Sequence, residues 1–235
     1  MHILVLQHER VEHPGIFRDF LKRDGHTWDA VELDEGEPLP GLDGYDALWV
    51  MGGPMDVWQE DQHPWLKDEK AIIREAVLDR EMPFLGLCLG HQLLAEALGG
   101  QVGPSKTPEI GVLDVNITNP EPLFDGMPET IACLQWHSAE VTDMPKGARI
   151  LASSPACAVQ AMAWKNHAYA LQFHMEIEAD TVANWAAIPE YAGALDKAMG
   201  EGAVARLDAE CTRQMETFNA MAEQLYGNWL KATSR

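Results

Sequence analysis

Residues 83–92 read Pro-Phe-Leu-Gly-Leu-Cys-Leu-Gly-His-Gln and place one cysteine, Cys88, between an apolar run typical of a buried strand and a run typical of a helix. The N–H groups at the start of a helix lower the pKa of a nearby thiol and can hold a developing oxyanion. Of the four cysteines, only Cys88 has glycines close by on both sides. The segment therefore predicts an enzyme in which Cys88 is the nucleophile.

On both sides of this segment, strand-like and helix-like runs alternate through the first hundred residues. Such alternation indicates an α/β protein with a parallel sheet covered by helices on both faces, and in such a sheet functional residues gather at the carboxyl ends of the strands. Cys88 follows one of these strands. The expected strands are 2–7, 28–33, 45–51 and 84–87, and the expected helices are 15–24, 65–81 and a third that ends at Gly99-Gly100.

The pattern changes after Gly100. Five short stretches predict antiparallel strands that add to the sheet, at 111–118, 139–142, 149–152, 158–165 and 168–173. From Ala179 the sequence is helical again, with an apolar stripe that favours packing in the core or between subunits over cofactor binding. We expect one domain over residues 1–190 and a C-terminal helical extension, 191–235, packed on it. Self-association through these helices stays open.

Composition limits the kinds of partner. The 17 Lys and Arg residues against 37 Asp and Glu give a formal charge of −20, which argues against nucleic acid or an anionic membrane as a partner. No apolar run is long enough for a membrane span and the N-terminus has no signal-peptide features, so we expect a cytoplasmic protein. The cysteine spacing and the spacing of His8, Glu9 and His13 fit no metal motif, so we expect free thiols, no metal and no cofactor.

A second segment carries chemistry. Residues 168–176 read Ala-Tyr-Ala-Leu-Gln-Phe-His-Met-Glu, an apolar strand that ends in His174 and, two positions later, Glu176. Side chains two apart share one face of an extended chain. A free thiol is only a few per cent ionised at neutral pH, so a nearby imidazole is the usual base and a carboxylate orients it. His174 alone would be read as a structural histidine, but together with the cysteine segment it predicts a Cys–His–Glu triad.

With these two segments the chain resembles the class I glutamine amidotransferases, whose nucleophile lies in Gly-x-Cys-x-Gly-x-Gln and whose other triad residues lie downstream in His-Pro-Glu. Residues 86–92 match all four signature positions, and a Gly52-Gly53-Pro54 turn follows the third strand. The resemblance covers residues 1 to about 185 and implies a three-layer, flavodoxin-like fold with a mostly parallel sheet and a small antiparallel addition. Met175 replaces the usual proline and removes a fixed φ between His174 and Glu176.

The resemblance also implies a covalent mechanism. Cys88 attacks the γ-carboxamide carbon of a glutamyl substrate, His174 moves the proton, Glu176 orients His174, and water releases glutamate from a thioester. The other implied roles are two oxyanion donors, the N–H groups of Gly53 and Leu89, and substrate contacts from Gly52, Gln92, His137 and Ser138. The last two lie in segment 134–141, which fits a polar turn between strands equally well.

Three functions stay open on the sequence. The leading hypothesis is hydrolysis of a γ-glutamyl amide bond, in glutamine or in a γ-glutamyl amine or peptide, with an acidic surface that attracts a cationic amine. The second is a glutaminase subunit that supplies ammonia to a separate synthase, as in GMP synthase, because the chain shows no phosphate-binding loop of its own. The third is a catalytically quiet binding or regulatory protein. An α/β-hydrolase fold would place the acid before the histidine, and here it follows.

Overall fold

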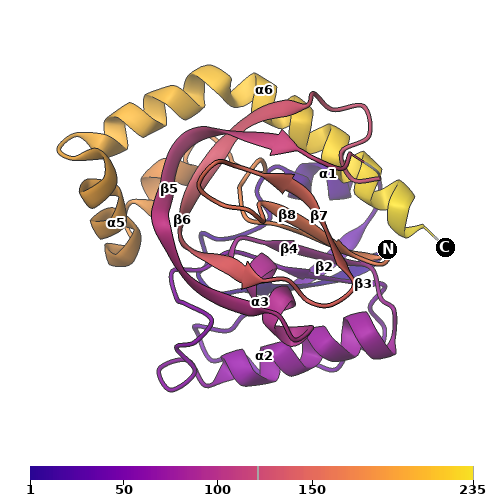
Figure 1. The fold of residues 1–235 in the computed structure, drawn as a ribbon. Helices are drawn as coiled ribbons and strands as arrows, with labels where there is room; N and C mark the ends of the chain where they lie inside the picture. Colours follow the sequence, from indigo (N-terminus) through magenta and orange to yellow (C-terminus); the bar gives the residue numbers. More distant parts are fainter. Residues whose placement is uncertain (121, 235) are drawn as a thin grey trace.

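A nine-stranded mixed sheet forms the centre of the computed structural model, which describes residues 1–120 and 122–234 (Figure 1). The strand order is β2-β1-β3-β4-β9-β8-β7-β5-β6; the first five strands pair in parallel and the remaining pairs are antiparallel. Arg235, the last residue of the predicted extension, lies outside the described residues. The strands are β1 (His2–Gln7), β2 (Thr27–Glu32), β3 (Ala47–Val50), β4 (Phe84–Leu87), β5 (Gln101–Ile117), β6 (Thr130–Asp143), β7 (Ala148–Ser153), β8 (Ala161–Trp164) and β9 (Ala168–Leu171).

Strand β1 shows why both faces of the sheet are covered. Ile3 and Val5 belong to one apolar core and Leu4 and Leu6 to another, because successive side chains of a strand point to opposite faces. Helices α1 and α6 pack on the first face and α2 and α3 on the second, which confirms the predicted α/β layers (Figure 1). The helices are α1 (Phe17–Arg23), α2 (Trp65–Arg74) with the π-helical turn η1 (Glu75–Asp79), α3 (Leu89–Ala97), α4 (Thr181–Trp185), α5 (Pro189–Met199) and α6 (Ala203–Thr233).

The order of the parallel strands determines where a ligand can bind. The chain runs from β1 outward to β2, then returns to the other side of β1 as β3 and continues to β4. This is the flavodoxin-like order, and ligands bind at the carboxyl ends of the strands where the direction of winding reverses. That point lies between β1 and β3, so the loops that begin at His8 and Met51 lie side by side there.

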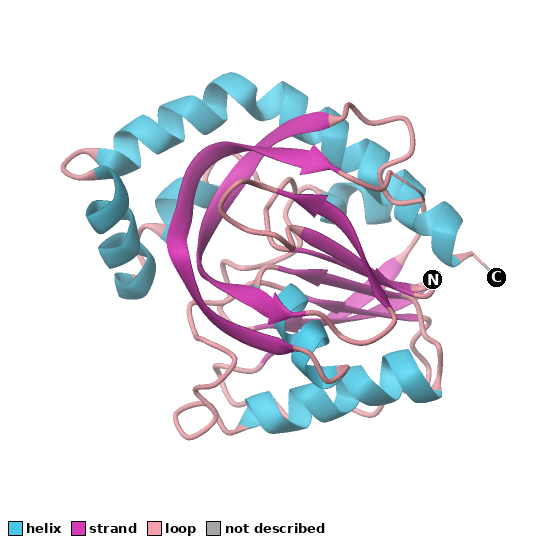
Figure 2. Ribbon diagram, in the orientation of Figure 1, coloured by secondary structure: helices cyan, strands magenta, loops and turns pink. Residues whose placement is uncertain are grey.

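The antiparallel strands are longer than the sequence suggested. Strands β5 and β6, with 17 and 14 residues, form a long curved ribbon (Figure 2). The interpretation of segment 134–141 as a turn is wrong, because it lies inside β6. Two prolines hid the beginning of β5, since proline lacks the N–H that a strand donates. The structure accommodates them with a register shift between Pro104 and Glu109.

The long C-terminal helix is part of the same core. The apolar stripe of α6 packs within the chain, with Leu207, Phe218 and Trp229 fully buried. Trp229 meets Trp49 of β3 edge-on at 5.3 Å between ring centroids, and its Nε1 donates to the carbonyl of Phe84 at 3.1 Å. The end of α6 therefore holds the centre of the parallel sheet. None of the helices in the described ranges is both long and apolar enough to cross a membrane.

Replacing Trp229 by alanine should lower the free energy of unfolding by about 3–5 kcal/mol, because it leaves a cavity between α6 and the sheet. Urea denaturation followed by far-ultraviolet circular dichroism measures the change. The matched control is Val204→Ala, at an exposed position of the same helix, which should change stability by less than about 0.5 kcal/mol. Equal effects of the two substitutions would contradict the packing of α6.

Candidate active site

Cys88 occupies a sharp turn between β4 and α3. Its backbone has φ 49° and ψ −100°, a conformation that residues other than glycine rarely adopt and that stores strain. The neighbouring glycines allow the turn to pack against β3, since a Cβ at Gly90 would lie 2.1 Å from the carbonyl oxygen of Val50 and one at Gly86 2.6 Å from that of Gly90. The glycines quoted from the sequence are therefore required by close approach.

His174 and Glu176 lie next to each other beyond the end of β9. His174 forms an isolated antiparallel bridge with Leu134 of β6, which keeps the chain extended. Its Nδ1 lies 2.6 Å from Oε1 of Glu176. The N–H of Met175 donates to Oε2 of Glu176 at 2.9 Å. The residue that replaces the usual proline thus supplies a donor that a proline lacks, and this bond holds the carboxylate beside the imidazole.

The electrostatics of His174 suit a group that carries a proton. Burial alone would lower its pKa, but the Glu176 carboxylate and a hydrogen bond with Cys88 outweigh burial and raise the pKa well above 6.5. The Trp185 ring of α4 packs edge-on against His174, with 4.6 Å between the ring centroids. A protonated imidazole beside the thiol favours the thiolate, which is the nucleophilic form.

The other three cysteines have no such setting. All four cysteines are free and buried, as predicted for Cys133 and Cys157. Burial raises the pKa of Cys157 and of Cys211 to about 12, and burial and nearby carboxylates raise that of Cys133. These thiols stay protonated near neutral pH, so only Cys88 combines a base with access to a cavity.

Gln172 is a neighbour of Cys88 that sequence reasoning missed. It is fully buried, and its Nε2 donates to Sγ of Cys88 at 3.5 Å. Its Oε1 accepts from Nε2 of Gln92 at 3.0 Å, which links two residues of the site across 80 positions of sequence. The sequence could have indicated Gln172, because it lies two positions before His174 and side chains two apart share one face of an extended segment.

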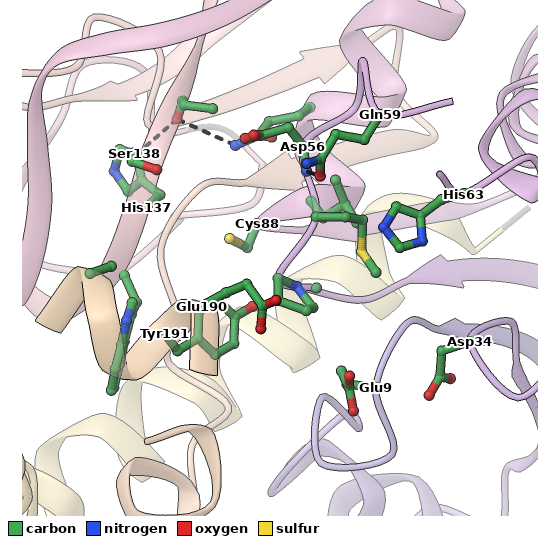
Figure 3. Close-up of a pocket in the computed structure, with 18 of the residues that line it drawn as sticks. Glu9, Asp34, Asp56, Gln59, His63, Cys88, His137, Ser138, Glu190 and Tyr191 are labelled. Atoms are coloured by element: carbon green, nitrogen blue, oxygen red, sulfur yellow. Dashed lines mark hydrogen bonds between the residues drawn. The ribbon is translucent and has the colours of Figure 1, made fainter. Parts of the chain in front are cut away.

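A cavity of about 510 Å³ opens above Cys88 (Figure 3). Its wall includes Gly53 and Leu89, the two predicted oxyanion donors. None of the hydrogen bonds in the described part of the chain uses the N–H of either residue. Both donors are therefore free for a ligand beside Cys88. A volume of this size lies within the range of about 300–1,000 Å³ that holds small-molecule ligands.

The predicted substrate-binding residues fall into two groups. Gln92, His137 and Ser138 line the cavity, and Gly52 is not among its described lining residues. Figure 3 labels His137 and Ser138 on the cavity wall. The His137 ring is turned toward the protein, with Nδ1 3.0 Å from the carbonyl of Ala139 and Nε2 3.3 Å from Oε2 of Glu109. Ser138 is exposed to the cavity, so it and the local backbone are available to a ligand while the imidazole is engaged.

Carboxylates gather on the wall of the same cavity. Four acidic residues line it and no Lys or Arg occurs among its described lining residues. Burial raises the pKa of Glu9, and so do the charges of Asp34 and Glu190; burial also raises that of Asp56. The labelled side chains lie around the space next to Cys88 (Figure 3). The cavity wall is thus acidic and would favour a cation.

Helix α5 brings Tyr191, the first residue of the predicted C-terminal extension, to this cavity. The Tyr191 hydroxyl donates to Oε1 of Glu12, a buried carboxylate after β1. Burial raises the pKa of Glu12, which also feels the charges of His174 and Glu176. Glu12 and Tyr191 lie 179 residues apart in sequence, so no local pattern could have paired them.

One group of side chains has the composition of a metal site. Ligand atoms of Glu109, His137 and Cys157 lie within 4.8 Å of one another. The Glu109 oxygens already accept from Oγ of Ser154 at 2.7 Å and from Nε2 of Gln160 at 2.8 Å. Protein donors thus satisfy both carboxylate oxygens of Glu109 without an ion. His8, Glu9 and His13, weighed as ligands in the sequence, form no such group among the described residues.

The strain at Cys88 predicts an unusual stability order: Cys88→Gly should be more stable than Cys88→Ala by about 1 kcal/mol. Glycine relieves about 1–3 kcal/mol of backbone strain at this position. This gain in stability exceeds the roughly 0.4–1 kcal/mol that glycine costs because its unfolded chain has more conformational freedom. The same two substitutions at Cys133, inside β6, are the control, and there glycine should be less stable than alanine by about 1 kcal/mol. Urea denaturation measures all four variants. The same order at both positions would contradict the strained turn.

Comparisons with known proteins agree on one family. The family described as Glutamine amidotransferase class-I matches residues 21–183, more than half of the chain. The glutamine amidotransferase-like protein YfeJ of Salmonella typhimurium is 31% identical over 190 residues, which cover 77% of this chain and 78% of that protein. One subunit of the glutamine-hydrolyzing GMP synthase of Sulfurisphaera tokodaii is 39% identical over 150 residues, 63% of this chain and 77% of that protein.

Solved structures share the whole architecture. A glutamine amidotransferase from Thermotoga maritima superimposes with a TM-score of 0.88 at 28% identity and covers 100% of this chain and 99% of its own. A glutamine amidotransferase from Methylobacillus flagellatus superimposes with a TM-score of 0.85 at 29% identity, and the match covers 99% of this chain and 95% of that chain. These matches include the C-terminal helices. The chain belongs to the class I glutamine amidotransferase family.

Proposed function

We propose that the protein hydrolyses γ-glutamyl amide bonds through a glutamyl thioester on Cys88. The observation that carries this proposal is that the Cys88 thiol and two unused N–H donors line one cavity, while the His174–Glu176 pair lies behind the thiol and His174 hydrogen-bonds to it. A nucleophile, a base with its orienting acid, and an oxyanion site are the parts that acyl transfer needs.

In the first half of the reaction the Cys88 thiolate attacks the γ-carbonyl carbon and the C=O electron pair moves to oxygen. The N–H groups of Gly53 and Leu89 stabilise this oxyanion, each worth about 3 kcal/mol in comparable sites. Protonated His174 gives its proton to the leaving amine, the C–N bond breaks and the thioester remains. Glu176 keeps Nδ1 of His174 occupied, so that Nε2 faces the reaction.

In the second half a water molecule attacks the thioester carbonyl. His174, now neutral, takes the proton from the water, and the same two N–H groups stabilise the second oxyanion. The thiolate leaves and glutamate is released. Gln172 donates to Sγ in the resting site and would stabilise the thiolate at the beginning and end of the cycle.

The acidic wall bears on the identity of the leaving amine. Glutamine would release ammonia, which needs little of a cavity of about 510 Å³. Glu9, Asp34, Asp56 and Glu190 would instead stabilise an amine that carries a second, cationic group. We therefore propose γ-glutamyl amines with a cationic tail as the preferred substrates. We also propose that the protein acts in the cytoplasm.

The second candidate is a glutaminase subunit that supplies ammonia to a separate synthase. The similarity to the Sulfurisphaera tokodaii protein supports it, because the name of that protein describes one subunit of a synthase. A subunit of this kind would be nearly idle by itself and would be activated by its partner. The activity of the isolated chain therefore distinguishes the two candidates. The intact triad geometry weighs against a catalytically quiet protein.

Three γ-glutamyl amides test the proposal: glutamine, the butylamide and the 4-aminobutylamide. The last two differ by one terminal ammonium. The isolated chain should release glutamate from all three, with kcat/KM for the 4-aminobutylamide about fivefold to tenfold above that for the butylamide, the gain expected from partly exposed carboxylates. Cys88→Ala should be slower by at least about a thousandfold.

Glu9→Gln should reduce the preference for the charged amide and leave turnover of the butylamide within about twofold, since only the contact with the tail changes. An equal rate for the two amides would refute the cationic tail. An idle chain would favour the role of a synthase subunit. Equal rates for the wild type and Cys88→Ala would exclude Cys88 as the nucleophile.

A further inference from the structure

His8 lies directly after β1, at the point where the winding of the sheet reverses, and the reaction scheme does not use it. The side chain is completely buried. Its Nδ1 lies 2.7 Å from the carbonyl oxygen of Gly52, and its Nε2 lies 2.8 Å from Oε1 of Glu69. A carbonyl oxygen only accepts, so Nδ1 carries a proton, and a further proton lies between Nε2 and Oε1 of Glu69.

Helix α2 holds this histidine in place. Glu69 is also completely buried, and its Oε2 has no hydrogen-bond partner in the described part of the chain, so His8 is the partner of this carboxylate. Trp65, one turn earlier on the same face of α2, stacks on the His8 ring at 5.4 Å and 21°. A buried carboxylate is costly unless it is paired, so Glu69 and His8 hold each other in place.

The bond to Gly52 fixes the direction of a peptide group. In a planar trans peptide the C=O of one residue and the N–H of the next point in opposite directions. The carbonyl of Gly52 points to His8, and so the N–H of Gly53 points away from it, and Gly53 lines the cavity beside Cys88. Two consecutive glycines hinder peptide rotation very little, so the orientation needs an anchor.

We infer that His8, held by Glu69, is a positioning residue that keeps the N–H of Gly53 directed at the oxyanion. The inference rests on the proposed function, because it acts through a donor assigned there. Burial lowers the pKa of His8, but the charge and hydrogen bond of Glu69 outweigh burial and raise it above 6.5. A cationic ring bound to the Gly52 carbonyl polarises the peptide, which makes the N–H of Gly53 a stronger donor.

The test separates the two nitrogens of His8. The side-chain amide of asparagine places an N–H near the position of Nδ1, and that of glutamine places one near Nε2. His8→Asn and His8→Gln are made in a Glu69→Gln background, so that no buried charge is left unpaired. Relative to this background, His8→Gln should lower kcat by about a hundredfold, the effect of losing one oxyanion donor, with KM within about threefold. The kcat of His8→Asn should stay within about tenfold of that of the Glu69→Gln background, because asparagine keeps the bond to Gly52.

A matched control is His167→Asn, since Nε2 of His167 also lies 3.0 Å from a carbonyl, that of Val77, at the opposite end of β9. It should leave kcat within about twofold, because that bond lies away from the reacting atoms. Thermal unfolding of every variant separates lost stability from lost turnover. Equal losses of kcat in the asparagine and glutamine variants, or a change in KM alone, would overturn the inference.

Crystal structures of the same variants give a readout that needs no turnover. The Gly52 carbonyl should face residue 8 in the Glu69→Gln protein and in His8→Asn, and should turn away in His8→Gln. If the wild-type chain turned over no γ-glutamyl amide, the proposed function would be wrong. The orientation of the Gly52–Gly53 peptide in these variants would still test the role of His8. An unchanged peptide in His8→Gln would overturn the role of His8 whatever the activity.

Discussion

The close approach of the Cys88 turn to strand β3 is the constraint on which the rest of the site depends. Gly90 lies so near the carbonyl of Val50 that any side chain would collide with it, and in the same turn Cys88 has a strained backbone conformation with φ 49°. The thiol is thereby directed into the cavity while α3 begins directly behind it. The strain is maintained because buried, well-packed strands on both sides over-determine the turn.

Three other loops converge on this turn because their strands are parallel neighbours. The end of β9 delivers His174 and Glu176, the end of β3 delivers the Gly52–Gly53 peptide, and the end of β1 delivers His8. The long antiparallel ribbon and helix α5 then close the space above the thiol with Ser138 and Tyr191. The sheet thus positions the groups proposed to carry the chemistry, and the later elements shape the cavity beside them.

Local patterns predicted the parts of the fold and site that depend on neighbouring residues. The turn at Cys88 follows from two glycines and an apolar strand, and the His174–Glu176 pair follows from a spacing of two in extended chain. The ribbon was underestimated because prolines interrupt the alternation of β5. The His8–Glu69 pair and the Glu12–Tyr191 bond join residues 61 and 179 positions apart, and only the folded topology brings such residues together.

In the proposed reaction, Cys88 carries the glutamyl group between the two halves. Rapid acid quenching of the wild-type chain with a γ-glutamyl amide, followed by peptide mass spectrometry, tests it directly. The peptide that contains Cys88 should carry the added mass of one glutamyl group, and the peptides that contain Cys133, Cys157 or Cys211 should carry none. Glutamate release with no adduct on Cys88, or an adduct on another cysteine, would show that Cys88 is not the nucleophile.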